Sequence, residues 1–280
     1  MKAIHIVRNL SARSTIPQAL IALGLCLAGP ARAESLIAQY SVKLIGLSLG
    51  TASIATKVDP ASYQVEATAR LSGVASMISN SKGAATASGV LAQGKVAPNA
   101  YATTSANSKM TRTIRIAMAA GTVKGSEISP PFDEAPGRIP ISEAHKRGII
   151  DPLSALVMPV GGAGPVIGPA ACDRTIPVYD GWTRFDVSLR YVGVRNVSTK
   201  GYAGPVAVCA ARYQPIAGHR PDRPATKFMA DNKNMEVWLA PVGESRVVMP
   251  YRISVATMIG TTVVEAIEFS TEPASKAAQR

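Results

Sequence analysis

The residues with the clearest chemical potential in this sequence are two cysteines, Cys172 and Cys209, which lie in or beside its most regularly alternating stretch. The third cysteine, Cys26, belongs to an N-terminal segment that we expect to be removed, which leaves an even count. An even count in an oxidising compartment predicts a disulfide, whereas a redox-active pair is usually close in sequence as C-x-x-C. We therefore predict a structural Cys172–Cys209 disulfide, which the chain-entropy model values at roughly 4 kcal/mol.

Groups that could act as acids, bases, nucleophiles or metal ligands are sparse elsewhere. The two histidines of the expected mature chain, His145 and His219, lie in different proline-rich inserts and lack the local spacing of a metal site. No G-x-S-x-G nucleophile motif occurs. We predict no catalytic residue, no metal and no cofactor. The alternative of a hydrolase stays open, and it requires two carboxylates among Asp180, Asp186 and Glu236 to converge in a cleft.

Two other groups of side chains are candidates for ligand contact. A basic cluster in the second insert could contact an anionic head group, with a solvated loop as the alternative. Its members are His219, Arg220, Arg223 and Lys227. Three aromatic residues could line a ligand cavity, with core packing as the alternative. They are Trp182, Trp238 and Tyr251.

The first 33 residues predict an export signal. Lys2, Arg8 and Arg13 precede a short apolar run over 16–29, and Ala31-Arg32-Ala33 matches a cleavage site. A membrane span needs ~20 apolar residues, and this run is shorter. We therefore expect cleavage after Ala33 and a soluble periplasmic protein.

The charge balance indicates the kind of partner. The formal net charge of the chain is +12. The leader contains four basic residues and no acidic one, which leaves the mature chain at +8. An exported protein rarely meets nucleic acid, so we expect none as a partner. Anionic lipid head groups, lipopolysaccharide or polyanionic glycans are the expected neighbours of a protein that is at most peripheral to the membrane. A merely solubilising basic surface is the alternative, and the oligomeric state is left open.

The elements that must position these groups are short strands joined by close turns. Period-2 alternation predicts seven strands between 36 and 128 and three more between 235 and 269. Asp180-Gly181 predicts a hairpin turn before a strand over 183–191. Alternation also predicts a strand around Cys209. Four apolar residues of the 183–191 strand share one face: Phe185, Val187, Leu189 and Tyr191.

The irregular segments are rich in proline and glycine. Inserts over 129–148 and 215–232 are expected to lack regular structure, apart from a helical turn that 142–147 could form, and 73–83 is expected to be a loop or short helix. Asp151-Pro152 predicts the start of a short apolar helix over 151–157 that covers the sheet. A flexible loop over 161–169 would lead to a strand containing Cys172.

These elements predict a mainly β fold. Regular strands without long intervening helices exclude a parallel βαβ sheet. We expect a curved antiparallel meander, either a β-spiral or a half-barrel, with one or two short helices. No break in composition divides it, so we predict one domain over 34–270 and a polar tail over 271–280.

Several short stretches together resemble a known family. They are Tyr40-x-Val42, Gly46-x3-Gly50, Asp151-Pro152-Leu153-Ser154-Ala155-Leu156, Ile176-Pro177-Val178-Tyr179-Asp180-Gly181, Trp238-Leu239 and Pro250-Tyr251-Arg252-Ile253. On these residues the chain resembles the bacterial exported family catalogued as domain of unknown function 3108 (DUF3108), over nearly the whole mature chain. The resemblance implies a Gram-negative periplasmic protein, similar in plan to envelope-integrity proteins and to half-barrel lipoprotein carriers. It carries over no catalytic residue.

The expected function is non-enzymatic support of the cell envelope, with a lipid or acyl chain held on the concave face of the sheet. Small residues on this face leave room that a bulky core would fill. They are Ala52, Ala67, Ala69, Ala85 and Ala87. The alternative for these alanines is packing against the 151–157 helix. Two other functions stay open, an envelope glycan- or lipid-acting hydrolase and a scaffold that binds another protein through a sheet edge.

Overall fold

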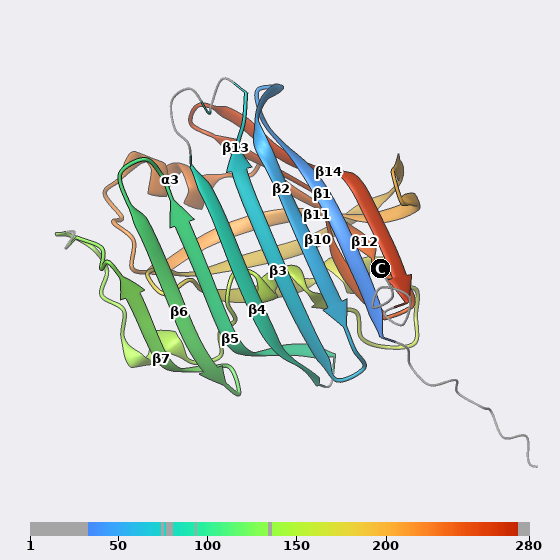
Figure 1. Ribbon diagram of the computed structural model, residues 1–280, viewed down its shortest axis with the longest axis horizontal. Coiled ribbons are helices and arrows are strands. Elements are labelled where there is room, and N and C mark those ends of the chain that lie inside the picture. The colour runs from blue at the N-terminus through green and yellow to red at the C-terminus, as the bar shows by residue number, and fades with distance from the viewer. Residues whose placement is uncertain (1–32, 74–75, 77–80, 93, 134–135, 274–280) are drawn as a thin grey trace, which may run out of the picture. The chain divides into compact units, whose positions relative to one another are not determined.

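The computed structural model describes residues 33–73, 76, 81–92, 94–133 and 136–273. The predicted signal peptide up to residue 32, most of the irregular segment 73–83 and residues 274–280 of the predicted tail lie outside the described residues. Within them, the chain forms a single antiparallel sheet of fourteen strands, which confirms the mainly β meander (Figure 1).

The first half of the sheet is built from consecutive hairpins. Its strands are β1 (Glu34–Leu44), β2 (Leu47–Val58), β3 (Ser62–Leu71), β4 (Lys82–Ala92), β5 (Lys95–Ala106), β6 (Thr111–Ala119) and β7 (Thr122–Ser129). All seven predicted strands are therefore present. Inward-facing and outward-facing residues alternate along them; in β3, for example, Tyr63 and Val65 are buried while Gln64 and Glu66 are exposed.

The second half follows an insert that spans residues 130–173. The insert contains β8 (Met158–Pro159), and the strands of the second half are β9 (Arg174–Tyr179), β10 (Arg184–Thr199), β11 (Tyr202–Ala217), β12 (Met235–Pro241), β13 (Val247–Thr257) and β14 (Gly260–Pro273). The predicted Asp180-Gly181 hairpin is present, since β9 pairs antiparallel with β10. Asp180 fixes the turn because its Oδ1 accepts the N–H groups of Trp182 and Thr183 at 2.8 and 2.6 Å.

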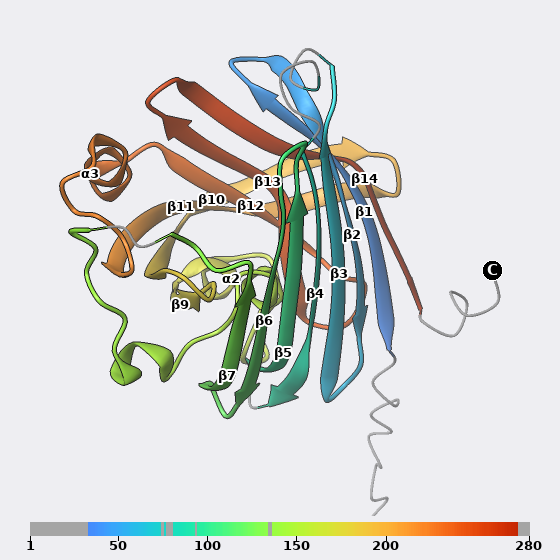
Figure 2. The same ribbon diagram turned by 60° about the vertical axis from the view of Figure 1, so that its left-hand side comes forward.

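The strand order is β7-β6-β5-β4-β3-β2-β1-β14-β13-β12-β11-β10-β9, with β8 paired to β13. Neighbours in the sheet are also neighbours in sequence, apart from the pairs β1–β14 and β8–β13. The first of these joins the two halves, and β10 and β11 then cross behind the wall formed by β2–β7 (Figure 2).

The sheet is not closed, but one segment of the insert bridges its two edges. Arg147 forms a bridge with Thr122 of β7, and Ile150 forms a parallel bridge with Val178 of β9. The Ile149 N–H donates to the carbonyl of Gly121 at 3.0 Å, and the Ile150 N–H donates to that of Pro177 at 2.8 Å. Residues 147–150 thereby form hydrogen bonds with backbone groups at both edges of the sheet, which would otherwise lack a neighbouring strand.

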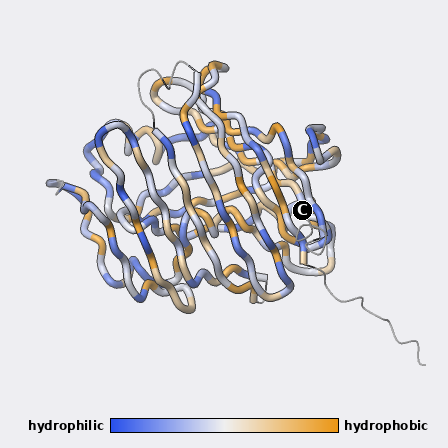
Figure 3. Tube along the Cα trace, viewed as in Figure 1, coloured by the Kyte–Doolittle hydropathy of each residue, from blue (hydrophilic) through white to orange (hydrophobic). Residues whose placement is uncertain are grey.

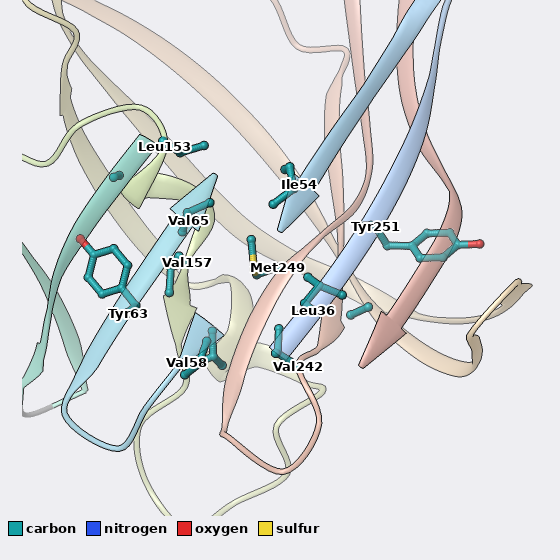
Figure 4. Packing of buried hydrophobic residues seen from close by; sticks show 14 of the residues in the cluster. Leu36, Ile54, Val58, Tyr63, Val65, Leu153, Val157, Val242, Met249 and Tyr251 are labelled. Atoms are coloured by element: carbon teal, nitrogen blue, oxygen red, sulfur yellow. The ribbon is translucent and has the colours of Figure 1, made fainter. Parts of the chain in front are cut away.

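The segment from 149 to 160 separates two apolar cores. Ile149, Leu153 and Val157 pack in the larger core with residues of β1–β6 (Figure 4). Met158 and Val160 pack in the smaller core, against β9–β13. The insert therefore fills part of the space between the two halves and presents a different set of side chains to each.

Three local expectations need correction. The helix predicted over 151–157 is a single 3-10 turn, η2 (Ser154–Leu156), whose N-cap residue is Leu153. The Asp151 carboxylate nevertheless accepts the N–H of Ser154 at the start of this turn, at 2.8 Å. Cys172 ends the short helix α2 (Pro169–Cys172) rather than lying in a strand. The second insert is not irregular throughout, because β11 continues to Ala217 and α3 (Pro224–Asp231) follows. In the first insert, the 3-10 turn η1 spans Glu143–Lys146.

The prolines that suggested an irregular second insert are accommodated for identifiable reasons. Pro215 lies near the end of β11, beyond the Ala207–Ala210 stretch that pairs with β12. The ladder with β10 has a register shift next to it, between Arg184 and Phe185, and prolines within sheets occur at such bulges and at edges. Pro224 lies at the first position of α3, where an N–H would have no intrahelical acceptor.

Candidate functional site

Strand register identifies one face of the sheet that runs through both halves. Directly opposed residues of antiparallel strands project to the same face. One such row crosses eight strands: Leu71, Gly50, Val42, Val264, Ile253, Val237, Cys209 and Tyr191. We call the face that carries this row the inner face. In the first half this face bears apolar residues of the larger core, and on β9–β13 it bears those of the smaller core. It also contributes to one hollow in each half.

The hollow in the second half, here called the apolar hollow, has a volume of about 230 Å³. Its walls come from β9–β13, and Pro152, Ala155, Leu156 and Met158 of the insert cover it. Nearly all of its lining side chains are apolar, and the β10 residues are those predicted to share a face. They are Phe185, Val187 and Leu189, with Ile176, Val178, Ala211, Met235, Val237, Pro250, Ile253 and Val255 from neighbouring strands.

Two polar residues border the apolar hollow without making it polar. The carboxylate of Glu236 accepts the indole N–H of Trp238 at 2.5 Å. Trp238 alternates with the lining residue Val237, so the carboxylate lies toward the opposite face. Ser254 is likewise one residue from Ile253 in β13. The hollow thus offers apolar contact without a charged group directed into it.

The hollow in the first half, here called the small-residue hollow, has a volume of about 420 Å³. Val42, Ala69, Leu71 and Gly83 line it from the inner face, with Ser105, Met110 and Arg112 at one side. Polar residues that alternate with these also line it: Thr51, Arg70 and Lys82. Arg112 opposes Ser105 in the ladder and so belongs to the same face. Its guanidinium donates to the carbonyls of Pro130 and Pro131 and lies 3.9 Å from the Phe132 ring centroid.

The alanines predicted to leave room divide between two environments. Ala87 is buried, and Ala52, Ala67 and Ala85 are half-buried against the larger core. Only Ala69 lines the small-residue hollow. Packing against the insert therefore accounts for part of the alanine pattern, and open space on the inner face accounts for another part.

The structure pairs Cys172 with Cys209 across a separation of 37 residues. Both cysteines are fully buried in the smaller core. Because Cys209 belongs to the inner-face row, the bond holds α2 against that face. The disulfide is thus part of the scaffold around the apolar hollow, although neither cysteine lines it.

The three aromatic candidates lie away from both hollows. Trp182 lies between Phe132 and Arg138. The ring centroids of Trp182 and Phe132 are 4.4 Å apart, and the guanidinium carbon of Arg138 lies 3.4 Å from the Trp182 ring centroid. Trp238 lies 5.0 Å from Arg252 and 5.3 Å from Arg195. Tyr251 is buried beside Tyr202 and Phe269, and Figure 4 shows its hydroxyl directed away from Met249. All three make packing contacts.

The basic candidates lie at and beside α3. Arg220 pairs with Asp222 at 2.9 Å, which lowers the pKa of that carboxyl. Arg223 and Lys227 are exposed. The Nδ1 atom of His219 is buried and has no partner among the described residues. Within the described part of the chain, Arg223 and Lys227 form no ion pair. No residue of the basic cluster lines either hollow.

The three acidic candidates are each engaged locally. Asp180 caps its turn, Asp186 pairs with Arg184 at 2.6 Å, and Glu236 binds Trp238. The described residues contain no group of three or more His, Cys, Asp or Glu that could hold a metal ion. Local contacts thus account for each of the carboxylates that a hydrolase would have to use.

The sequence predicted Asp151 only as the residue that starts a helix, but its carboxylate is also buried. Its Oδ1 accepts the N–H groups of Leu153 and Ser154, while its Oδ2 is buried without a partner among the described residues. Burial raises its pKa, and the hydrogen bonds from Ser154 and Leu153 oppose this rise. The Tyr63 hydroxyl donates to Ser154 Oγ at 2.7 Å, so the cap is tied to β3. The Asp-Pro pair signalled the cap but not its burial.

Comparison with known proteins gives a family and a fold. Residues 39–267 match the family described as "Protein of unknown function (DUF3108)". The crystal structure of a beta-barrel-like protein of domain of unknown function DUF1849 from Brucella abortus is similar, with a TM-score of 0.50 and 8% sequence identity. The match covers 87% of this chain and 99% of that one. No curated protein matches. Within the described residues, no helix has the length and apolar character to cross a membrane.

Proposed function

The chain belongs to the DUF3108 family, and we propose that it is a non-enzymatic protein of the bacterial periplasm that holds a lipid acyl chain on the inner face of its sheet. The apolar hollow carries this proposal. A cavity of about 150 Å³ lined by aliphatic and aromatic side chains stays dry and binds small apolar molecules. The apolar hollow is larger, at about 230 Å³, and it is lined in the same way.

The surroundings of the hollow support an elongated apolar ligand. The inner-face row continues from Ile253 through Val264 to Val42, which lines the small-residue hollow. A chain that extends beyond the apolar hollow would therefore meet apolar side chains along the same face. Arg112 lies at the far side of the small-residue hollow, where its positive charge would favour an anionic head group.

The periplasmic location rests on two features of the chain. The first 33 residues have the order of an export signal, and the buried Cys172–Cys209 disulfide suits an oxidising compartment. N-terminal sequencing of the protein recovered from the periplasm tests this part of the proposal. Recovery of an unprocessed chain with free thiols from the cytoplasm would refute it.

Native mass spectrometry followed by lipid extraction tests ligand binding directly. We expect protein purified from an exporting bacterial host to carry a mass excess that matches an extracted lipid. Binding of dansylaminoundecanoic acid, measured by fluorescence, gives an affinity for the same site. A folded wild-type protein that binds neither a cellular lipid nor the probe would overturn the proposal.

A matched pair of substitutions assigns the binding to the apolar hollow. Val187→Trp places a large side chain in the hollow, because half-buried Val187 lines it. Val194→Trp makes the same change at an exposed position of the same strand. We expect the first variant to weaken probe binding by at least about tenfold, or about 1.4 kcal/mol, and the second to leave it unchanged. Equal affinities of the two variants would place the ligand elsewhere.

A further inference from the structure

Two neighbouring turns expose a group of large apolar side chains that neither core nor hollow uses. The turn between β1 and β2 presents Ile45 and Leu47, which are 67% and 66% exposed. The turn between β13 and β14 presents Met258 and Ile259, which are 59% and 71% exposed. Both turns lie at the upper end of the sheet in Figure 1, and the trace in Figure 3 is partly coloured as hydrophobic there. We call these four residues the hairpin-tip surface.

The two turns are held together as one unit. The Ile45 N–H donates to the carbonyl of Thr261 at 3.0 Å. A Cβ atom added at Gly260 would lie within contact distance of the Ile45 side chain, so the turns pack closely. The two turns are therefore adjacent, which brings their four exposed apolar side chains to one end of the sheet.

Ile45 also occupies a backbone conformation that is costly for its side chain. Its φ is 51°, in the left-handed region where a β-branched residue is a genuine outlier. Asparagine or glycine would adopt this turn position with less strain. An exposed isoleucine at such a position gains nothing from core burial. Observed strain of this kind motivates a functional hypothesis, here that the side chain is needed at the surface.

The unpaired charge around the hairpin-tip surface is of one sign, because Glu265, which opposes Ser41, pairs with Arg252 at 2.9 Å. The strand ends at this end of β1–β6, β13 and β14 comprise residues 40–51, 69–73, 81–83, 105–112 and 256–262, and these contain no Asp or Glu. They contain five cations: Lys43, Arg70, Lys82, Lys109 and Arg112. Among the described residues, none of the five forms an ion pair. Exposed apolar side chains surrounded by unpaired cations match the interface of an anionic bilayer.

We propose that the hairpin-tip surface docks on an anionic phospholipid bilayer, with its four apolar side chains inserted at the head-group level and the cations against the phosphates. A second copy of the chain is a poorer occupant, because a symmetric contact would oppose two sets of cations. Met110 and Arg112 of the small-residue hollow lie at the same strand ends, so docking would turn that hollow toward the lipid. Docking stands without the acyl-chain proposal, since it requires no bound ligand.

Vesicle co-sedimentation tests the docking. The protein is purified from an exporting host, with its N-terminus determined by mass spectrometry, because an uncleaved leader would bind lipid by itself. We expect binding to vesicles of phosphatidylglycerol and phosphatidylethanolamine to exceed binding to phosphatidylcholine vesicles by at least about tenfold, and to weaken with salt. Equal binding to both, or none to the anionic vesicles, would overturn the proposal.

A matched pair of double variants identifies the surface. Ile45→Asn with Ile259→Ser removes two apolar side chains, and asparagine suits the positive φ, so the variant should remain folded. Ile37→Asn with Ile267→Ser makes the same changes at strand positions that are 53% and 54% exposed. We expect the first to lose at least about tenfold in binding to the anionic vesicles and the second to retain it. Equal retention by both variants would overturn the assignment.

Two further measurements separate the competing outcomes. Light scattering measures the mass of the protein in solution. A wild-type dimer that the Ile45→Asn/Ile259→Ser variant converts to a monomer, without vesicle binding by either, would assign the surface to a second copy instead. The same variant should still bind dansylaminoundecanoic acid, and Val187→Trp should still bind vesicles. Failure of docking and failure of acyl-chain binding are thereby distinguishable.

Discussion

The two halves of the sheet bury their inner faces in different ways. In β1–β7, consecutive hairpins carry the apolar residues, and the side chains become smaller toward the upper strand ends, where Ala69 and Gly83 line an open hollow. In β9–β13, the disulfide holds α2 on the inner face, and the insert covers a hollow whose lining is nearly all apolar. The strands of the first half pair as consecutive hairpins, whereas the second half adds a covalent bond between segments 37 residues apart.

The largest expected difference between the halves comes from the disulfide. Replacing both cysteines, Cys172→Ala with Cys209→Ala, should lower the free energy of unfolding by about 4 kcal/mol, because the closed loop spans 37 residues. Hydrogen exchange should increase most in β9–β12, where α2 is attached, and least in β2–β5. Denaturant unfolding and peptide-resolved exchange measure the two effects. A uniform increase over both halves would show that they unfold as one unit.

Equal additions of volume should affect the two halves unequally. Ala207 is fully buried in the smaller core, so Ala207→Leu should cost about 1–3 kcal/mol through overpacking. Ala69 is exposed and lines the small-residue hollow, so Ala69→Leu should change stability by less than about 0.5 kcal/mol. Thermal and denaturant unfolding of both variants compare the packing directly. Similar losses would mean that the inner face of the first half is as tightly packed as the second.

The smallest effect concerns Asp151, which lies on the segment between the two cores. Its pKa is raised in the folded state, so the folded protein binds the proton more tightly than the unfolded chain. Stability should therefore fall as pH rises from the ordinary carboxyl pKa, about 3.9, through the raised value. Asp151→Asn keeps an oxygen acceptor for the capping N–H groups and should remove this fall, with a gain of about 1 kcal/mol at neutral pH.

A matched substitution controls for a general charge effect. Asp222→Asn removes an exposed carboxylate whose pKa its partner Arg220 lowers, so the fall in stability over this pH window should persist. Urea unfolding across pH 3–8 measures all three proteins. If Asp151→Asn kept the wild-type slope, another group would have to cause the pH dependence.

Local signals were sufficient for the strands and several turns. Alternation of neighbouring side chains depends only on the backbone geometry of a strand, so all seven strands of the first half and the shared face of Phe185, Val187 and Leu189 were predictable. Asp180-Gly181 specified a hairpin because its turn conformation is set by these two residue types. α3 was missed because the prolines of the second insert suggested irregular structure, although Pro224 lies at the first position of the helix, where a proline is tolerated.

The candidate site was less predictable than the fold. The alanine pattern indicated free space on one face, but only Ala69 of the five alanines lines the small-residue hollow, and the others pack at the larger core. The aromatic and basic candidates were chosen by residue type, and the structure places them in packing contacts or at exposed positions away from the hollows. Residue type does not specify which side chains approach each other across the sheet.

The sequence by itself determined the strands, their inward faces, the cysteine pair and the mainly β class, because these depend on local periodicity and residue counts. Only the tertiary structure decided that β1 pairs with β14, that Arg147 and Ile150 bridge the sheet edges, and that the insert divides the interior into two cores. These features arise from pairings between residues distant in the chain. Their energies depend on the simultaneous fit of several elements, which no single segment of the sequence encodes.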